Sequence, residues 1–103
     1  MKLKSKRSKA CDISQKTKEI VFERDNHKCI LCGSRYGQPN AHFIARSKGG
    51  LGIEQNIVTL CLRCHQNYDF GDYEQHHNIQ NYIREYLKSK YENWNEEDLL
   101  YKK

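Results

Sequence analysis

The sequence predicts one small α+β domain, in which two short strands and a four-cysteine metal site lie between an N-terminal helix and a long C-terminal helix. Three observations predict it. Two Cys-x-x-Cys pairs bracket the middle of the chain, β-branched and apolar segments lie between them, and an apolar stripe of helical period follows them. The 103 residues suffice for one domain and not for two.

The N-terminal helix is expected over residues 13–25. Ile13, Ile20 and Val21 recur at i, i+7 and i+8, as they do on one face of a helix. Asp12 precedes this pattern and is expected to be the N-cap, with Gln15 as its partner three residues later.

The bracketed segments predict the centre of the fold. Residues 41–44 and 56–60 are apolar or β-branched, which favours strands. A short helix is expected to open near Cys61, and residues 77–94 carry a stripe of apolar and aromatic residues at helical spacing. This stripe is expected to pack on the strands rather than on a partner protein.

These elements define a single domain at residues 12–95, with a strand–strand–helix core at about 40–70. Residues 1–11 hold few apolar groups and many charges, so we expect a disordered basic arm there. Residues 96–103 are expected to form a tail.

The formal net charge is +5, and basic residues gather at the N-terminus. A basic arm indicates a polyanionic partner, nucleic acid first, or else a solubilising tail. No apolar run approaches the roughly 20 residues that span a membrane. The basic start lacks the apolar middle of a signal peptide. We therefore expect a cytoplasmic protein, whose thiols stay reduced.

Paired cysteines with reduced thiols indicate metal ligands rather than disulfides, and the four-thiolate set of Cys29, Cys32, Cys61 and Cys64 is typical of structural Zn²⁺. Gly33 is expected to supply the tight turn after the first pair. The second pair with the following histidine also matches the C-x-x-C-H haem-attachment pattern. Haem attachment would require export of the protein and would leave Cys29 and Cys32 without a role. The remaining thiol, Cys11, is expected to be unpaired and in a mobile region.

Residues 41–50 and 56–65 together resemble the motif of the HNH endonuclease family. His42 lies on the first expected strand and a glycine-rich loop follows; Asn56 opens the second strand, and His65 follows the second cysteine pair. The similarity covers about residues 20–70, and the whole chain is similar to small phage-associated HNH proteins. The resemblance implies a ββα-metal fold and divalent-metal-dependent hydrolysis of DNA phosphodiester bonds.

The resemblance also implies roles for single residues. His42 would be the general base that activates a water. Asn56 would orient His42 or complete the shell of a catalytic Mg²⁺, Mn²⁺ or other divalent ion, and His65 would bind that ion. Asp69 lies four residues after His65, so on a helix it can point to the same ion, or else be a solvent-facing acid. Members often carry a metal-binding Asp or His before the base, where this chain has Ala41.

DNA contacts are predicted for Arg46 and Lys48 on the glycine-rich loop and for Arg63 within the second cysteine pair. None indicates a base-reading code, so we expect nicking with weak sequence preference. The alternative is a non-catalytic, zinc-stabilised nucleic-acid-binding module or an accessory of phage packaging proteins. His76 and His77 are interpreted as surface or capping groups, with His77 as a possible extra ligand. The sequence leaves the oligomeric state open.

Overall fold

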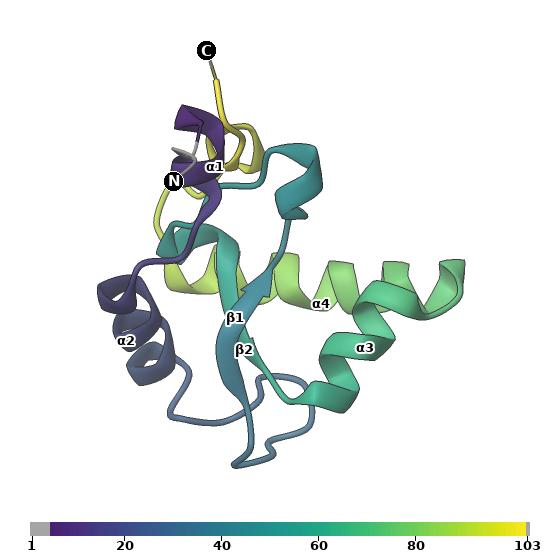
Figure 1. The fold of residues 1–103 in the computed structure, drawn as a ribbon. Helices are drawn as coiled ribbons and strands as arrows, with labels where there is room; N and C mark the ends of the chain where they lie inside the picture. The colour runs from purple at the N-terminus through teal and green to yellow at the C-terminus, as the bar shows by residue number, and fades with distance from the viewer. Residues whose placement is uncertain (1–4, 103) are drawn as a thin grey trace.

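The computed structural model describes residues 5–102, and it confirms the predicted α+β class. Four α-helices surround a two-stranded sheet (Figure 1). In residues 5–102, no helix has the length and apolar character needed to cross a membrane. The elements in chain order are α1 (Lys6–Cys11), α2 (Gln15–Arg24), β1 (Gln38–His42), β2 (Ile57–Leu60), α3 (Leu62–Phe70) and α4 (Tyr73–Lys90), with 3₁₀ turns η1 (Arg46–Lys48), η2 (Glu54–Asn56) and η3 (Glu96–Leu99).

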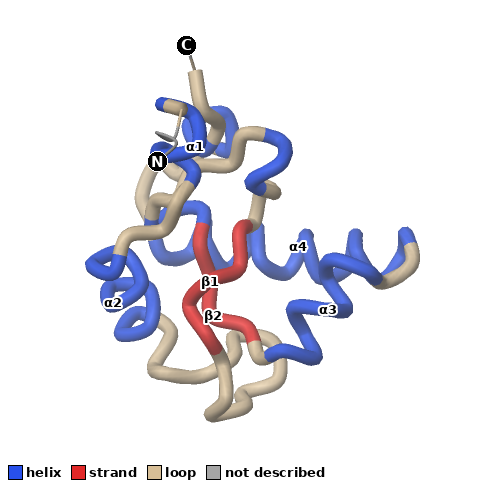
Figure 2. Tube along the Cα trace, in the orientation of Figure 1, coloured by secondary structure: helices blue, strands red, loops and turns tan. Residues whose placement is uncertain are grey.

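The two strands pair antiparallel at the centre of the molecule (Figure 2). Ala41 lies opposite Val58 and His42 opposite Ile57. Every residue of β2 is buried, because α2 packs against the two strands and α4 crosses behind them (Figure 1). The strands therefore form a buried support, and the chain that leaves each strand carries the candidate functional residues.

A buried charged pair joins α2, β2 and α4. The Arg24 guanidinium contacts the Asp25 carboxylate at 2.7 and 3.1 Å and donates to the Ile57 carbonyl oxygen at 2.7 Å. The other Asp25 contacts are the Thr59 backbone N–H at 2.8 Å and the Tyr86 hydroxyl at 2.6 Å, both donors. Moving α2 away from the sheet would break these bonds and leave a buried charge without its partner, which is costly. The network therefore fixes α2 against the sheet.

Three helix boundaries differ from the sequence predictions. Ser14, not Asp12, is the N-cap of α2, and its hydroxyl accepts from the Thr17 backbone N–H at 3.1 Å. The long helix begins earlier than expected because Asp72 caps it, accepting from the Gln75 N–H at 2.8 Å. It ends at Lys90 instead of continuing to residue 94.

The prediction of a disordered arm is wrong for residues 6–11, which form helix α1; residues 1–4 of that arm lie outside the described part of the chain. Ser5 caps this helix, and Cys11 is buried at 1% exposure. The prediction of a mobile Cys11 is therefore also wrong. Cys11 is buried and its segment is hydrogen-bonded, which the composition of residues 1–11 did not indicate.

The predicted tail is likewise part of the packed structure. Leu99 belongs to the hydrophobic core, and its carbonyl oxygen accepts from the Leu51 N–H at 2.8 Å. Leu100 forms a β-bridge with Gly50. Trp94 packs edge-on to Phe43. Because Leu99 is part of the core, the domain extends beyond residue 95. As Figure 1 shows, α1 and η3 lie together at one end of the molecule.

Candidate functional site

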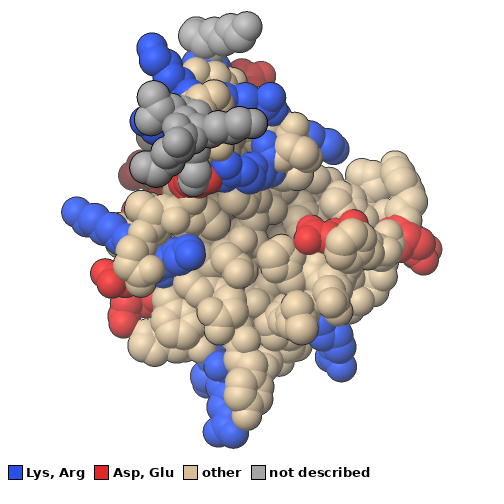
Figure 3. All heavy atoms as spheres, viewed as in Figure 1, with Lys and Arg blue, Asp and Glu red and all other residues tan. Residues whose placement is uncertain are grey.

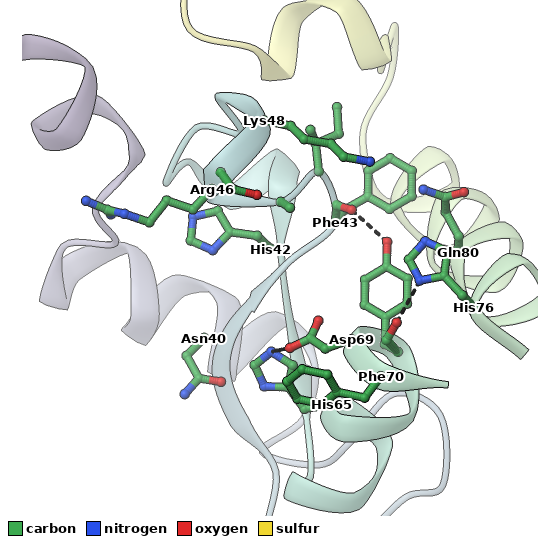
Figure 4. Close-up of a pocket in the computed structure, with 14 residues that line it drawn as sticks. Asn40, His42, Phe43, Arg46, Lys48, His65, Asp69, Phe70, His76 and Gln80 are labelled. Carbon is green, nitrogen blue, oxygen red and sulfur yellow. Dashed lines mark hydrogen bonds and ion pairs between the residues drawn. The ribbon is translucent and has the colours of Figure 1, made fainter. Parts of the chain in front are cut away.

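A surface cavity of about 490 Å³ lies between the chain leaving β1 and the helices α3 and α4. It brings together His42, His65 and Asp69, three of the side chains that the sequence singles out (Figure 4). Arg46 and Lys48 lie on its rim. Side chains from residues 40–48 and from two helices therefore share one opening, and both predicted imidazoles face the same space.

The position of His42 follows from its place at the end of β1 and from one hydrogen bond. Its Nε2 lies 2.9 Å from the carbonyl oxygen of Cys11. A carbonyl can only accept, so Nε2 carries the proton of the neutral ring and Nδ1 keeps a lone pair. Burial, together with the nearby positive charge of Arg46, lowers the pKa of His42 below its usual 6.5, against the opposing effect of the Cys11 hydrogen bond. The ring is therefore neutral near pH 7.

His65 and Asp69 lie one turn apart on α3. The His65 Nε2 is 3.3 Å from the Asp69 Oδ2, and both side chains are partly exposed toward the cavity. An imidazole nitrogen and a carboxylate oxygen at this separation form a donor pair that one divalent ion could share. Figure 4 shows the pair below His42, at the opposite side of the opening.

Asn56 does not reach the cavity, which corrects the prediction that it completes the metal shell. Its side chain is fully buried. The amide oxygen accepts from the Ile44 N–H at 2.9 Å, and the amide nitrogen donates to the Ile44 and Leu51 carbonyl oxygens at 3.2 and 2.8 Å. Its backbone carbonyl accepts from Phe43 at 2.7 Å. Asn56 thus clamps both ends of the glycine-rich loop and fixes the backbone that follows His42.

The residue before His42, Ala41, carries no metal-binding group, and its side chain points away from the cavity. Its side chain is fully buried in the hydrophobic core, whereas His42 lines the cavity. Successive side chains of a strand point to opposite faces, so position 41 faces the core while position 42 faces the cavity. A hard ligand at position 41 would be buried away from the cavity in this chain.

Two residues of the cavity were not predicted as site residues: Asn40 was not considered, and His76 was interpreted only as a surface or capping group. Asn40 lines the opening two residues before His42, on the same face of β1, and strand alternation could have indicated it. His76 also lines it, and its Nδ1 lies 2.6 Å from the Tyr68 carbonyl oxygen. His76 lies three and seven residues before Ile79 and Ile83, on the packed face of α4, and that spacing was the available signal.

Tyr68 holds this part of the wall in place. Its ring stacks on His76 with centroids 4.7 Å apart, and its hydroxyl donates to the Phe43 carbonyl oxygen at 2.7 Å. Burial raises the pKa of Tyr68 to about 12, so the hydroxyl stays protonated and acts as a donor. His77, considered as a possible ligand, contacts Tyr73 instead and is not among the residues that line the cavity.

The predicted DNA-contacting cations occupy three different environments. Arg46 binds the Asp12 carboxylate and donates to the Ser8 hydroxyl at 2.8 Å. Lys48 is exposed on the rim of the cavity, whereas Arg63 is exposed on α3 and does not line it. On the face that Figure 3 shows, basic side chains gather around α1 and the adjoining loop, and acidic ones gather near the α3–α4 turn.

The four predicted thiolate ligands form one cluster below the strands. Their sulfur atoms all lie within 4.8 Å of one another, and Cys32 and Cys61 are 3.6 Å apart. Tetrahedral zinc with bonds of about 2.3 Å separates its sulfurs by about 3.8 Å. Gly33 has φ of +77°, the left-handed conformation expected of this turn. The four cysteines are therefore positioned to bind a metal such as zinc.

Backbone donors surround this cluster. Burial alone would raise the pKa of Cys29, but hydrogen bonds from the backbone at Cys32, Cys61 and Leu31 lower it to about 7. Cys64 has its pKa raised by burial and by the neighbouring thiols. Thiolates rather than thiols bind metals, so a cation that binds this cluster would displace the remaining thiol protons.

Comparison with known proteins places these residues in one family motif. The sequence model of a family described as HNH endonuclease matches residues 29–71. The match begins at the first cysteine pair and ends after α3, so it includes His42, Asn56 and His65.

Among curated proteins, the chain is similar to one named Anaredoxin, from Nostoc sp. strain PCC 7120. The two are 32% identical over 59 residues, which cover 56% of this chain and 78% of that protein. No solved structure matches the chain.

We expect Cys61→Ser to lose the metal of the thiolate cluster and to unfold the domain. Structural zinc typically contributes about 10–16 kcal/mol to the folding of small modules, which exceeds the net free energy of unfolding of an average domain. Cys11→Ala is the matched control, because Cys11 is buried outside the cluster. Elemental analysis should find about one metal ion per chain in the wild type and in the control, and none in Cys61→Ser. Equal metal content in both variants would contradict the assignment.

Proposed function

Because the chain belongs to the HNH endonuclease family, we propose that it is a divalent-metal-dependent endonuclease that hydrolyses DNA phosphodiester bonds. The observation that carries this proposal is the shared cavity: His42 enters it from β1 and the His65–Asp69 pair enters it from α3. A general base and a pair of hard-metal donors that face one opening can act on one phosphate.

The base in this proposal is the Nδ1 atom of His42. Since Nε2 is committed to the Cys11 carbonyl, Nδ1 is the nitrogen that can take a proton from the attacking water. The lowered pKa keeps the ring neutral, and therefore able to accept, at pH 7. Once protonated, the ring remains hydrogen-bonded to Cys11, so its orientation is preserved through the reaction.

His65 and Asp69 are the residues that would hold a catalytic Mg²⁺ or Mn²⁺. Such an ion supplies neutralisation of the charge that develops on the phosphate and on the leaving 3′-oxygen. The amide of Asn40 and the imidazole of His76 line the same cavity and can hydrogen-bond water or phosphate oxygens there. Asn56 takes no direct part, and its role is to hold the loop after His42.

Other groups of the chain would bind the DNA and stabilise the fold. Lys48, exposed on the rim, is placed to contact a phosphate next to the scissile one. A single centre cuts one strand at a visit, so the expected product is a nick with weak sequence preference. Zinc in the four-cysteine cluster is the structural ion of this proposal. Neither the family description nor the name of the curated relative mentions phage packaging, so we include no packaging partners in this proposal.

A second candidate function is a non-catalytic, zinc-stabilised module that binds nucleic acid. The buried Ala41 and the fully engaged Asn56 favour it, because they leave His65 and Asp69 as the principal donors for a catalytic ion. This candidate predicts retention of DNA with no strand cleavage in either Mg²⁺ or Mn²⁺.

The decisive variant is His42→Ala in a supercoiled-plasmid nicking assay with Mg²⁺ or Mn²⁺. General bases contribute about 10²–10⁴-fold to rate, and we expect a loss of that size. His77→Ala is the control, because His77 lies on α4 one residue beyond His76 but does not line the cavity. Wild-type cleavage that His42→Ala leaves unchanged would refute the base assignment.

The pH dependence tests the same assignment independently. His42 must be neutral to accept a proton, so activity should rise with pH through the pKa of His42 and then level off. Because that pKa is lowered, the midpoint of the rise in kcat/KM should fall below pH 6.5. The midpoint should be the same in Mg²⁺ and Mn²⁺. A midpoint above pH 7 that moves with the metal would identify a metal-bound water instead and contradict the prediction.

A further inference from the structure

We propose that the N-terminal segment, residues 5–12, is a positioning element of the candidate site, and that the Cys11 backbone carbonyl orients the His42 ring. The segment lies before residues 29–71, which carry the family match. Its effect on rate rests on the proposed endonuclease function. Its effect on the ring is a property of the free protein and is measured separately.

Four residues of the segment bond to the glycine-rich loop. Arg7 donates to the Ser47 carbonyl oxygen at 3.0 Å, and Ala10 accepts from the Gly52 N–H at 3.0 Å. Arg46 of the loop also bonds to the Asp12 carboxylate and to Ser8. A helix of six residues is marginal by itself, so these contacts are what hold α1 in place.

The contact with His42 has a chemical consequence. An imidazole on a strand can rotate about its last side-chain torsion, and each orientation presents a different nitrogen to the cavity. The Cys11 carbonyl, 2.9 Å from Nε2, favours one of them and retains the proton on that nitrogen. Figure 4 shows His42 beside Arg46, the residue that anchors the segment. Displacing the segment would free the ring and expose Nε2 to water.

Gly52 offers a way to displace the segment with one methyl group. A Cβ at this position would lie 2.0 Å from the Asp12 carbonyl oxygen and 3.0 Å from that of Cys11, both of them backbone atoms. Alanine at position 52 must therefore push the chain at residues 11 and 12 away from the loop. The change adds no charge and removes no side chain that faces the cavity.

The experiment is NMR of the full-length protein with ¹⁵N-labelled histidine. In the wild type we expect an Nε2-bound proton of His42 that exchanges slowly with water, because it is hydrogen-bonded and half-buried. Gly52→Ala should lose this protected proton while the dispersion of the backbone amide signals stays that of a folded chain. Asp12→Ala, which removes the Arg46 anchor, should speed its exchange. Lys9→Ala, exposed on the same helix, is the control and should retain it.

Plasmid nicking by the same proteins links position to rate. A misplaced catalytic group costs about 10²-fold, and we expect that loss in kcat for Gly52→Ala with little change in KM. A proton that exchanges freely in the wild type, or that stays protected in both Gly52→Ala and Asp12→Ala, would overturn the positioning role. A protected wild-type proton in a protein that never nicks DNA would uphold the positioning role and refute the endonuclease function.

Discussion

The arrangement of the candidate site depends on four sulfur atoms held at one point. Cys61 is the N-cap of α3 and Cys64 lies in its first turn, so a metal that binds both sets the direction of the helix that carries His65. The first pair is tied to the sheet by the Ile30 N–H, which donates to the Thr59 carbonyl oxygen at 3.0 Å. The metal site thus relates α3 to the strands, and with them to His42. In a domain of this size, the small hydrophobic core alone would hold α3 against the strands only weakly.

Residue type and spacing were enough to predict the parts of the site that carry side-chain chemistry. The cysteine pairs could be interpreted as one metal site because two Cys-x-x-Cys pairs are typical of zinc ligands. His42 and His65 were predicted to share a site, and they line one cavity. The two strands and the three helices α2, α3 and α4 were also indicated, although the caps at Ser14 and Asp72 shifted the starts of α2 and α4.

Contacts made through the backbone or over long separations could not be predicted in this way. The Cys11 carbonyl meets His42 across 31 residues, and every residue type has a carbonyl, so nothing in the sequence marks this one. Asn56 has the residue type of a ligand, yet burial turns its amide toward the backbone of Ile44 and Leu51. The order of α1 likewise comes from docking on the loop through Arg46, whereas its composition indicated disorder.

For the proposed endonuclease function, a base on β1 and a metal ion on α3 must act on the same phosphate. A crystal of the full-length protein with a short DNA duplex and Mn²⁺, measured at the manganese absorption edge, tests it most directly. We expect an anomalous peak bonded to His65 and Asp69, with a DNA phosphate between that ion and the Nδ1 atom of His42. A peak held elsewhere, or a phosphate that reaches the ion but not His42, would contradict it.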